Sequence, residues 1–310
     1  MPRVAIVGSG LVGRGWAIVF ARAGWDVAVH DAGPGVAASA LGLITDGLEE
    51  LARHGLVDDP AAAAARVRAA EDLADAVDGV SYVQESVPEV VEAKQAAFRD
   101  LDALAPPDAI LASSASAIVA SLFTEELAGR ARCLVAHPVN PPHLVPLVEL
   151  CGAPWTAPET VERARAVLTA VGQVPITVNR EIDGFVLNRL QGALLAEAFR
   201  LVADGVVSPE DLDKTVADGL GLRWSFLGPL ATAELNAPDG FADYWARYGG
   251  SYASVQVEPA GPEVFGPATI ARVVEAWGDA PAPEWVAARS RWRDQRLAAL
   301  IAHKRAQPPG

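Results

Sequence analysis

The N-terminal segment constrains the fold of this chain more than any other stretch. Val4–Val7 is an apolar run that predicts a buried strand, and it leads directly into the motif Gly8-Ser9-Gly10-Leu11-Val12-Gly13. Residues 16–23 then carry apolar side chains at helical spacing, and the pattern ends at Gly24. A strand, a glycine-rich turn and a helix in this order predict a nucleotide-binding βαβ unit.

The glycines have separate roles in such a turn. Gly8 permits the tight turn, Gly10 lets the backbone approach a pyrophosphate, and Gly13 lets the helix pack on the strand. Leu11 and Val12 begin the helix, whose free N–H groups and positive potential attract a diphosphate. We therefore predict that this segment binds a dinucleotide.

The residue after the second strand points to the type of dinucleotide. Val27–His30 is the apolar run that predicts this strand, and Asp31 follows it. A carboxylate at this place can accept hydrogen bonds from the ribose hydroxyls of adenosine. It would repel a 2′-phosphate by a few kcal/mol at intermediate dielectric. The predicted cofactor is NAD rather than NADP; FAD remains the alternative, although no further motif favours it.

The first half of the chain alternates between apolar runs and segments of helical periodicity. Beyond the first two strands, further strands are predicted near residues 80–83, 110–112 and 134–136. This alternation predicts an α/β fold with a Rossmann-like, doubly wound parallel sheet. Two amphipathic segments, Ala37–His54 and Pro60–Ala70, predict a helical hairpin that projects from the sheet.

Beyond Val178 the pattern becomes helical. Gly184–Asp204 predicts a long helix, and Ser208-Pro209 supplies the cap and the first-turn proline of another. The remaining sequence alternates helical pattern with glycine and proline breaks. We predict an NAD-binding domain over residues 1–180 and an all-helical second domain over residues 181–310.

The stretch Cys133–Leu150 places a histidine and a glutamate in two apolar runs joined by a proline-rich connection. His137 follows the first run and Glu149 lies within the second. Runs joined in this way predict paired strands, which can bring the imidazole and the carboxylate into contact. A histidine at a strand end is often only structural, but one held by a carboxylate is a general base tuned near neutral pH. With a nicotinamide cofactor, the pair predicts alcohol oxidation or its reverse.

Composition excludes several other classes of function. The net charge of −14 argues against nucleic acid as a partner, because phosphate binding depends on clustered Lys and Arg. Two isolated cysteines predict neither a disulfide framework nor a metal site, and they favour a reducing compartment. The first strand starts directly after Arg3, without a signal peptide, and the apolar stretches are too short to cross a bilayer. We expect a cytoplasmic protein with no membrane partner.

Five motifs stand out along the chain. In order they are the glycine turn, Glu85-Ser86-Val87-Pro88-Glu89, Ser113-Ser114-Ala115-Ser116, His137-Pro138-Val139-Asn140-Pro141 and Gly184-Phe185-Val186-Leu187-Asn188-Arg189. Together, in this order, they resemble the 3-hydroxyacyl-CoA dehydrogenase superfamily, and within it the lambda-crystallin group of L-gulonate 3-dehydrogenases. The resemblance covers nearly the whole chain. It implies a Rossmann-like domain followed by a helical domain that forms a homodimer.

The resemblance also implies roles for individual residues. His137 would be the base and Glu149 its partner, with Ser116 and Asn188 as polar groups around the reacting carbon of the substrate. The cofactor side of the cleft would include Glu89, Lys94, Ser114 and Asn140. Lys94 could instead be a solvated helix residue, and Ser116 a helix cap. The chain departs from the family pattern at Ala115, where relatives commonly have Thr, so one hydroxyl contact is missing.

The substrate class is predicted from charge. Coenzyme A is a polyanion, and the resemblance implies that the helical hairpin would supply lysines to bind it. Here the hairpin has no lysine and several acids, although Arg53, Arg66 and Arg68 remain. This favours a small free hydroxy acid, with Arg223 as a candidate for its carboxylate, or else as a surface ion pair.

Three alternatives to this function stay open. One is a true 3-hydroxyacyl-CoA dehydrogenase. Another is a carnitine 3-dehydrogenase, because an aromatic wall near Trp224 could bind a quaternary ammonium. The third is a protein without catalysis, either crystallin-like or an NAD-binding regulator, although retention of the four site residues argues against it. A hydroxyisobutyrate-type enzyme is disfavoured because that type uses a lysine base.

Overall fold

The structure is a computed structural model that describes residues 1–256, 258–278 and 280–308. The chain divides into two compact units. The first contains residues 1–188 together with the described residues from Ala288 onward, and the second contains Arg189–Ala287. Each unit is described by itself.

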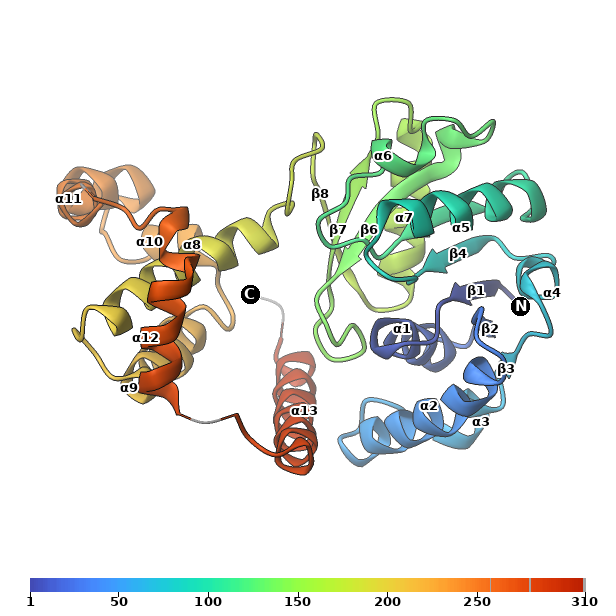
Figure 1. Cartoon of the computed structure of the whole chain (residues 1–310), viewed down its shortest axis with the longest axis horizontal. Coiled ribbons are helices and arrows are strands. Elements are labelled where there is room, and N and C mark those ends of the chain that lie inside the picture. Colours follow the sequence, from blue (N-terminus) through green and yellow to red (C-terminus); the bar gives the residue numbers. More distant parts are fainter. Residues whose placement is uncertain (257, 279, 309–310) are drawn as a thin grey trace. The chain divides into compact units, whose positions relative to one another are not determined.

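The first unit is built on one eight-stranded sheet in the order β3-β2-β1-β4-β5-β6-β7-β8 (Figure 1). Its strands are β1 (Arg3–Val7), β2 (Asp26–His30), β3 (Val67–Ala69), β4 (Tyr82–Glu85), β5 (Ile110–Ser113), β6 (Cys133–Pro138), β7 (Leu147–Gly152) and β8 (Val174–Thr177). All neighbouring strands are parallel except β6 and β7, which are antiparallel. The predicted α/β class with a Rossmann-like sheet is confirmed.

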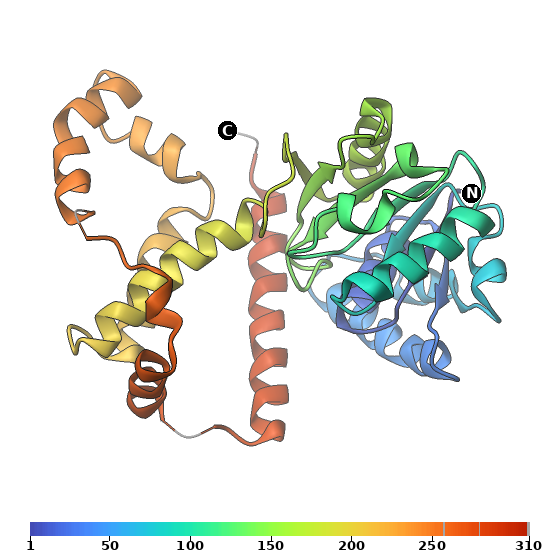
Figure 2. The same cartoon turned by 45° about the horizontal axis from the view of Figure 1, so that its top comes forward.

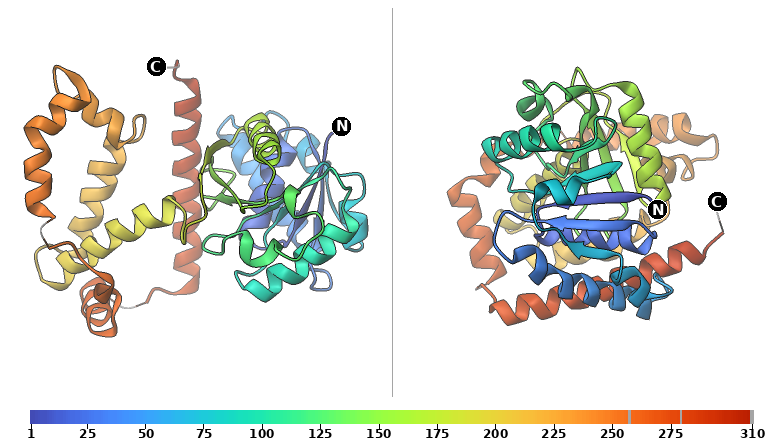
Figure 3. Two further views of the ribbon diagram at one scale, coloured as in Figure 1. Left: turned by 90° about the horizontal axis from the view of Figure 1, so that it is seen from above. Right: turned by 90° about the vertical axis from the view of Figure 1, so that its right-hand side faces the viewer.

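Helices pack on both faces of this sheet (Figure 3). They are α1 (Leu11–Arg22), α2 (Val36–Arg53), α3 (Pro60–Ala64), α4 (Leu73–Val77), α5 (Val91–Leu104), α6 (Ser121–Thr124), α7 (Pro158–Ala170) and α13 (Pro283–Ala306). Side chains alternate along each strand: Val4 and Ile6 enter one core with α1, α2 and α7. Ala5 and Val7 enter the other with α4 and α5. The strands are therefore buried on both sides, as a parallel sheet requires.

The predicted helical hairpin is only partly correct. Helix α2 matches Ala37–His54, but α3 has five residues and the chain then enters β3, which pairs with β2. The hairpin does not project from the sheet, because Ile44, Leu48 and Leu51 of α2 are fully buried in the core around α1. The alanine-rich sequence favours a helix throughout, and pairing with β2 overrides that preference.

The second unit contains only helices among its described residues (Figure 2). They are α8 (Leu187–Ala203), α9 (Pro209–Lys214), a π-helical turn (Thr215–Gly221), α10 (Pro229–Glu234), α11 (Gly240–Val255), a 3₁₀ turn (Pro262–Phe265) and α12 (Pro267–Trp277). The predicted cap of α9 is present, because the Ser208 hydroxyl accepts from the N–H of Asp211. Helix α8 starts three residues later than predicted, since Gly184 and Phe185 have positive φ.

The last helix belongs to the first unit, in contrast to the predicted domain over residues 181–310. Ala298 of α13 is 1% exposed in the core around α1 and α2, and Leu297 and Ile301 pack beside it. The sequence of α13 is polar on most of its faces. It therefore has no apolar stripe from which its packing against the first unit could be predicted. The chain therefore passes from the first unit to the second after residue 188 and returns to the first unit at residue 288.

Candidate active site

The turn between β1 and α1 has the geometry of a dinucleotide site. Gly8 has φ +98, and a Cβ there would lie 2.5 Å from the carbonyl oxygen of Ser86. A Cβ on Gly13 would lie 1.8 Å from the carbonyl oxygen of Gly8, so only glycine lets α1 pack on the turn. A Cβ on Gly10 would meet no atom within 4 Å, which leaves open space where a pyrophosphate can approach the backbone. Helix α1 has no side-chain cap, which leaves its N-terminal N–H groups for an anion.

A cleft of about 620 Å³ lies beside this turn, at the carboxyl ends of β1, β2 and β4. It is lined by Gly8 and Gly10 of the turn, by Asp31 after β2, and by small residues of α5. Asp31 accepts hydrogen bonds from the N–H and the hydroxyl of Ser9, both at 2.8 Å, and from the N–H of Gly33. Partial burial opposes ionisation, but these bonds outweigh it and lower the pKa of Asp31. Asp31 therefore presents a fixed negative charge to the cleft.

His137 and Glu149 are directly opposite each other on the antiparallel strands β6 and β7. The Nδ1 atom of His137 lies 2.7 Å from Oε2 of Glu149, and both side chains are buried. With Nδ1–H donated to this carboxylate, Nε2 is the nitrogen that can accept a proton. The contact predicted from the two apolar runs is present.

The other oxygen of Glu149 holds the start of α8. Oε1 accepts from the backbone N–H groups of Val186 and Leu187, both at 2.9 Å. Burial alone would raise the pKa of Glu149, but the hydrogen bonds from His137, Leu187 and Val186 outweigh it and lower the pKa. Phe185, just before the helix, is fully buried at φ +47, with its ring centroid 5.6 Å from that of His137.

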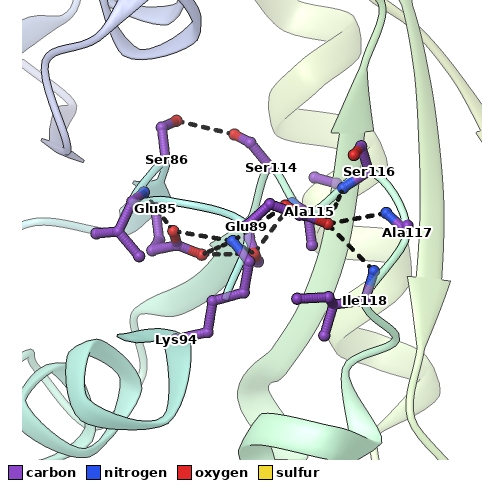
Figure 4. Close-up of polar contacts among 12 residues, drawn as sticks. Glu85, Ser86, Glu89, Lys94, Ser114, Ala115, Ser116, Ala117 and Ile118 are labelled. Atoms are coloured by element: carbon purple, nitrogen blue, oxygen red, sulfur yellow. Dashed lines mark hydrogen bonds and ion pairs between the residues drawn. The ribbon is translucent and has the colours of Figure 1, made fainter. Parts of the chain in front are cut away.

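Ser116 and Asn188 meet through the backbone. The amide Nδ2 of Asn188 donates to the carbonyl oxygen of Ser116 at 2.8 Å. The N–H groups of Ser116, Ala117 and Ile118 all donate to Oε1 of Glu89, at 2.8, 2.9 and 3.2 Å (Figure 4). We call residues 116–118 the Ser116 bend. Burial would raise the pKa of Glu89, but the backbone bonds and Lys94 outweigh it and lower the pKa.

Lys94 lies behind this bend. Its Nζ is 3.2 Å from both carboxylate oxygens of Glu85, 3.4 Å from the hydroxyl of Ser113 and 3.6 Å from Oε2 of Glu89. Its side chain is 1% exposed, so Lys94 is not a solvated helix residue. The predicted role of Lys94 in cofactor binding stays a prediction. Burial raises the pKa of Glu85, although Lys94, Ser113 and Val87 act in the opposite direction.

The other predicted residues are placed as follows. The Ser114 hydroxyl accepts from Gln84 Nε2 at 2.7 Å and from Trp16 Nε1 at 3.1 Å, and it lies 2.9 Å from the hydroxyl of Ser86. Asn140 is exposed and precedes a cis peptide bond to Pro141.

Arg223 is exposed in the second unit, so its role as a carboxylate ligand stays a prediction. The hydrogen bonds described above bring together His137, Glu149, Asn188, the Ser116 bend and Glu89. Two further residues belong to this site but were not predicted from the sequence. They are Phe185, which packs beside His137, and Glu85, which contacts Lys94.

No group of three or more His, Cys, Asp or Glu side chains among the described residues is arranged to hold a metal ion. No described helix combines the length and the apolar character needed to span a bilayer.

The sheet, the glycine turn and the Asp31 cleft define a Rossmann-type, NAD-dependent oxidoreductase. The chain belongs to the 3-hydroxyacyl-CoA dehydrogenase family. The NAD binding domain of that family matches residues 3–182, and its C-terminal domain matches residues 184–263. This confirms the resemblance seen in the sequence motifs, as well as NAD as the cofactor.

Similar proteins cover nearly the whole chain. Lambda-crystallin of Oryctolagus cuniculus is 43% identical, and the match covers 99% of this chain and 97% of that protein. L-carnitine dehydrogenase of Pseudomonas putida is 34% identical, with 96% and 92% covered. Among solved structures, 5-formyl-3-hydroxy-2-methylpyridine 4-carboxylic acid 5-dehydrogenase, described as an NAD⁺-dependent dismutase, has a TM-score of 0.85. It is 29% identical, with 99% of this chain and 100% of that chain covered.

Proposed function

We propose that the protein oxidises a free 3-hydroxy acid, similar to L-gulonate, to the 3-keto acid with NAD. The observation that carries this proposal is the buried contact between His137 and Glu149, 2.7 Å apart in a chain that also has the NAD cleft. When NAD is bound, its nicotinamide ring supplies the acceptor for the hydride of the alcohol carbon. Gly8, Gly10 and Asp31 would hold the cofactor.

His137 acts as the general base in this proposal. Its Nε2 takes the proton of the secondary alcohol, while Glu149 fixes the tautomer and stabilises the imidazolium that forms. Glu149 is itself kept ionised by the N–H groups of Val186 and Leu187. Asn188 uses one amide hydrogen on the Ser116 carbonyl, so its second hydrogen and its oxygen stay available to orient the substrate.

A free acid is favoured over a CoA thioester because the cations of the α2–β3 segment are already paired. Arg53 contacts Glu50. Arg66 lies 3.2 Å from Asp26, and Arg68 lies 2.6 Å from Asp75. A polyanion binds well where cations are clustered and unpaired. The segment has no lysine to replace them.

The test is a substrate panel followed by NADH absorbance. The panel contains L-gulonate, L-carnitine, 3-hydroxybutyrate and 3-hydroxybutyryl-CoA, each with NAD and with NADP. Turnover of L-gulonate or 3-hydroxybutyrate with kcat/KM at least about tenfold above that of the CoA thioester supports the proposal. Preference for the thioester would overturn it. Preference for L-carnitine would select the second candidate, which the 34% identity to L-carnitine dehydrogenase favours.

We also propose that the protein is a cytoplasmic homodimer that associates through the second unit. Exposed apolar side chains are frequent on this unit; examples are Leu190, Leu194, Leu230, Trp245 and Val255. An apolar surface of this kind marks an interface in soluble proteins. Light scattering is expected to give about twice the chain mass of 32.4 kDa, the mass that a closed two-fold pair would have. A monomeric mass at micromolar concentration would contradict this.

A further inference from the structure

We propose that the hydroxyl of Ser86 donates a hydrogen bond to an acceptor oxygen in the nicotinamide mononucleotide half of bound NAD. A chain of buried hydrogen bonds that ends at Ser114 orients the Ser86 hydroxyl for this contact, so Ser114 is a positioning residue. The inference depends on NAD as the cofactor and not on the proposed substrate. Failure of the substrate class therefore leaves it unaffected.

The first step is the place of Ser86 in the sheet. Strand β1 pairs with β2 on one side and with β4 on the other, so the order of the strands reverses at β1. Dinucleotides bind in the crevice outside the carboxyl ends of the strands at such a point. Ser86 is the first residue after β4, and it lines the cleft together with Gly8 and Gly10. A Cβ on Gly8 would lie 2.5 Å from the Ser86 carbonyl oxygen, so the two backbones are in contact.

This place also selects the half of the cofactor. Asp31 follows β2 and lines the cleft on that side of β1, where its carboxylate suits the ribose of adenosine. Ser86 lies across β1, at the end of β4. A dinucleotide whose adenosine ribose is held by Asp31 therefore extends its other half toward Ser86.

The second step is the orientation of the Gln84 amide. Gln84 is fully buried, and its Nε2 lies 2.7 Å from the hydroxyl oxygen of Ser114 and 3.4 Å from the carbonyl oxygen of Ala136. Its Oε1 accepts from the hydroxyl of Tyr82 at 3.1 Å. A carbonyl oxygen can only accept, so the Ala136 contact puts the amide hydrogens on this side. Gln84 is therefore a donor to Ser114.

The third step is the direction of the bond between the two serines. The indole N–H of Trp16 also donates to the Ser114 hydroxyl oxygen, at 3.1 Å. A hydroxyl group has two lone pairs and one hydrogen. Trp16 and Gln84 occupy both lone pairs of Ser114, so its contact of 2.9 Å with the Ser86 hydroxyl must use the Ser114 hydrogen. Ser114 is the donor and Ser86 is the acceptor.

The hydrogen of the Ser86 hydroxyl is thereby left for a ligand. Among the described residues, Ser114 is the one hydrogen-bond partner of this hydroxyl. Figure 4 shows the two hydroxyls side by side, apart from the contacts around Lys94. Ser86 is partly exposed, and a hydroxyl that accepts a hydrogen bond becomes a stronger donor. NAD brings acceptor oxygens on its ribose and diphosphate groups into this cleft.

The test is a fluorescence titration of the full-length protein with NADH, without a hydroxy acid. Ser86→Ala should raise the Kd of NADH about three- to tenfold, the effect of one net hydrogen bond. Ser86→Cys keeps a side chain of similar size but only a weak donor, so it should raise the Kd to a similar extent. An unchanged Kd in both variants would overturn the proposal, because the Ser86 hydrogen would then not reach the cofactor.

Two controls separate a lost contact from general damage. Ser81→Ala replaces an exposed serine just before the other end of β4 and should leave the Kd of NADH unchanged. AMP lacks the nicotinamide mononucleotide half, so its Kd in Ser86→Ala should stay within about twofold of the wild-type value. Equal weakening of AMP and NADH would overturn the proposal, because the variant would then have disturbed the glycine turn.

A double-mutant cycle tests the role of Ser114. Ser114→Ala removes the group that orients Ser86, so in that background Ser86→Ala should raise the Kd of NADH by a factor at least about twofold smaller. Ser114→Cys, whose sulfur is a weak acceptor for Trp16 and Gln84, serves if Ser114→Ala is unstable. If the two substitutions act independently, Ser114 does not orient Ser86 and the positioning role is wrong.

Discussion

The carboxylate of Glu149 holds His137 with one oxygen and the first residues of α8 with the other. The proposed base and the helix that carries Asn188 are therefore positioned by a single side chain. The antiparallel pairing of β6 with β7 makes this possible, because it puts residues 137 and 149 directly opposite each other. A parallel neighbour would have required a long crossover between them.

His137 is expected to be essential for turnover. His137→Ala should lower kcat by about two to four orders of magnitude, the usual contribution of a positioned general base. NADH affinity should change little, because the cofactor cleft is lined by other residues. Initial rates with the best hydroxy acid, measured by NADH absorbance, check this. His54→Ala, at a histidine of the C-terminal end of α2 that lies 3.4 Å from Glu50, is the control. Turnover within about tenfold of wild type would exclude the base role.

Glu149 should contribute to stability in a pH-dependent way. Its pKa is lowered in the folded protein, so the contribution is fully present above the ordinary pKa of 4.5 and is lost as pH falls through the lowered value. At pH 7, Glu149→Gln should reduce the free energy of unfolding by about 1.5–3 kcal/mol, because charged hydrogen bonds are lost. The difference from wild type should shrink as the solution is acidified below pH 4.5. Urea unfolding at several pH values measures it.

A suitable control is Glu162→Gln, whose carboxylate is 71% exposed. Its unfolding free energy should follow that of wild type at every pH. A difference between Glu149→Gln and wild type that stays constant, or grows on acidification, would contradict the lowered pKa.

Asp31 should determine the choice of NAD over NADP. Asp31→Ser removes the charge that repels the 2′-phosphate and the acceptor for the ribose hydroxyls. The ratio of kcat/KM for NAD to that for NADP should fall by at least about tenfold, since the lost repulsion is worth more than 1.4 kcal/mol. Steady-state kinetics with both cofactors gives the ratio, and Asp26→Ser, at the start of the strand β2 that precedes Asp31, is the control. An unchanged ratio would show that another residue selects the cofactor.

Phe185 combines a buried side chain with a strained backbone. Phe185→Ala should destabilise the protein by about 3–5 kcal/mol through the cavity it leaves. A glycine usually makes a protein less stable than an alanine at the same position. The backbone of Phe185, however, has φ +47, a conformation that glycine adopts more easily than alanine. The Phe185→Gly variant should therefore be about 1 kcal/mol more stable than the Phe185→Ala variant. Thermal unfolding of the two variants tests the order. If the alanine variant proves the more stable, Phe185 is not strained.

Much of the site was predictable because local patterns determine it. The glycine turn, Asp31 and the His137–Glu149 contact follow from strand and helix periodicity within short segments. The antiparallel pairing needs only a short connection, so the contact between residues 137 and 149 is local.

The parts that could not be predicted depend on long-range packing. Strand β3 forms only because β2 offers an edge, and α13 returns to the core around α1 from the far end of the chain. The Glu85–Lys94 cluster joins residues of different elements through burial, which no spacing reveals. The positive φ of Phe185 likewise could not be predicted from the residues around it.

The return of α13 to the first unit affects how the protein is made. Ala298 fills the same core as residues near the N-terminus, while residues 189–287 form a unit of their own. During synthesis the earlier part of the sheet leaves the ribosome long before the helix that covers it. The core around α1 and α2 therefore stays partly exposed to solvent until translation of the chain has almost ended. Expression of residues 1–188 alone should yield an aggregation-prone product.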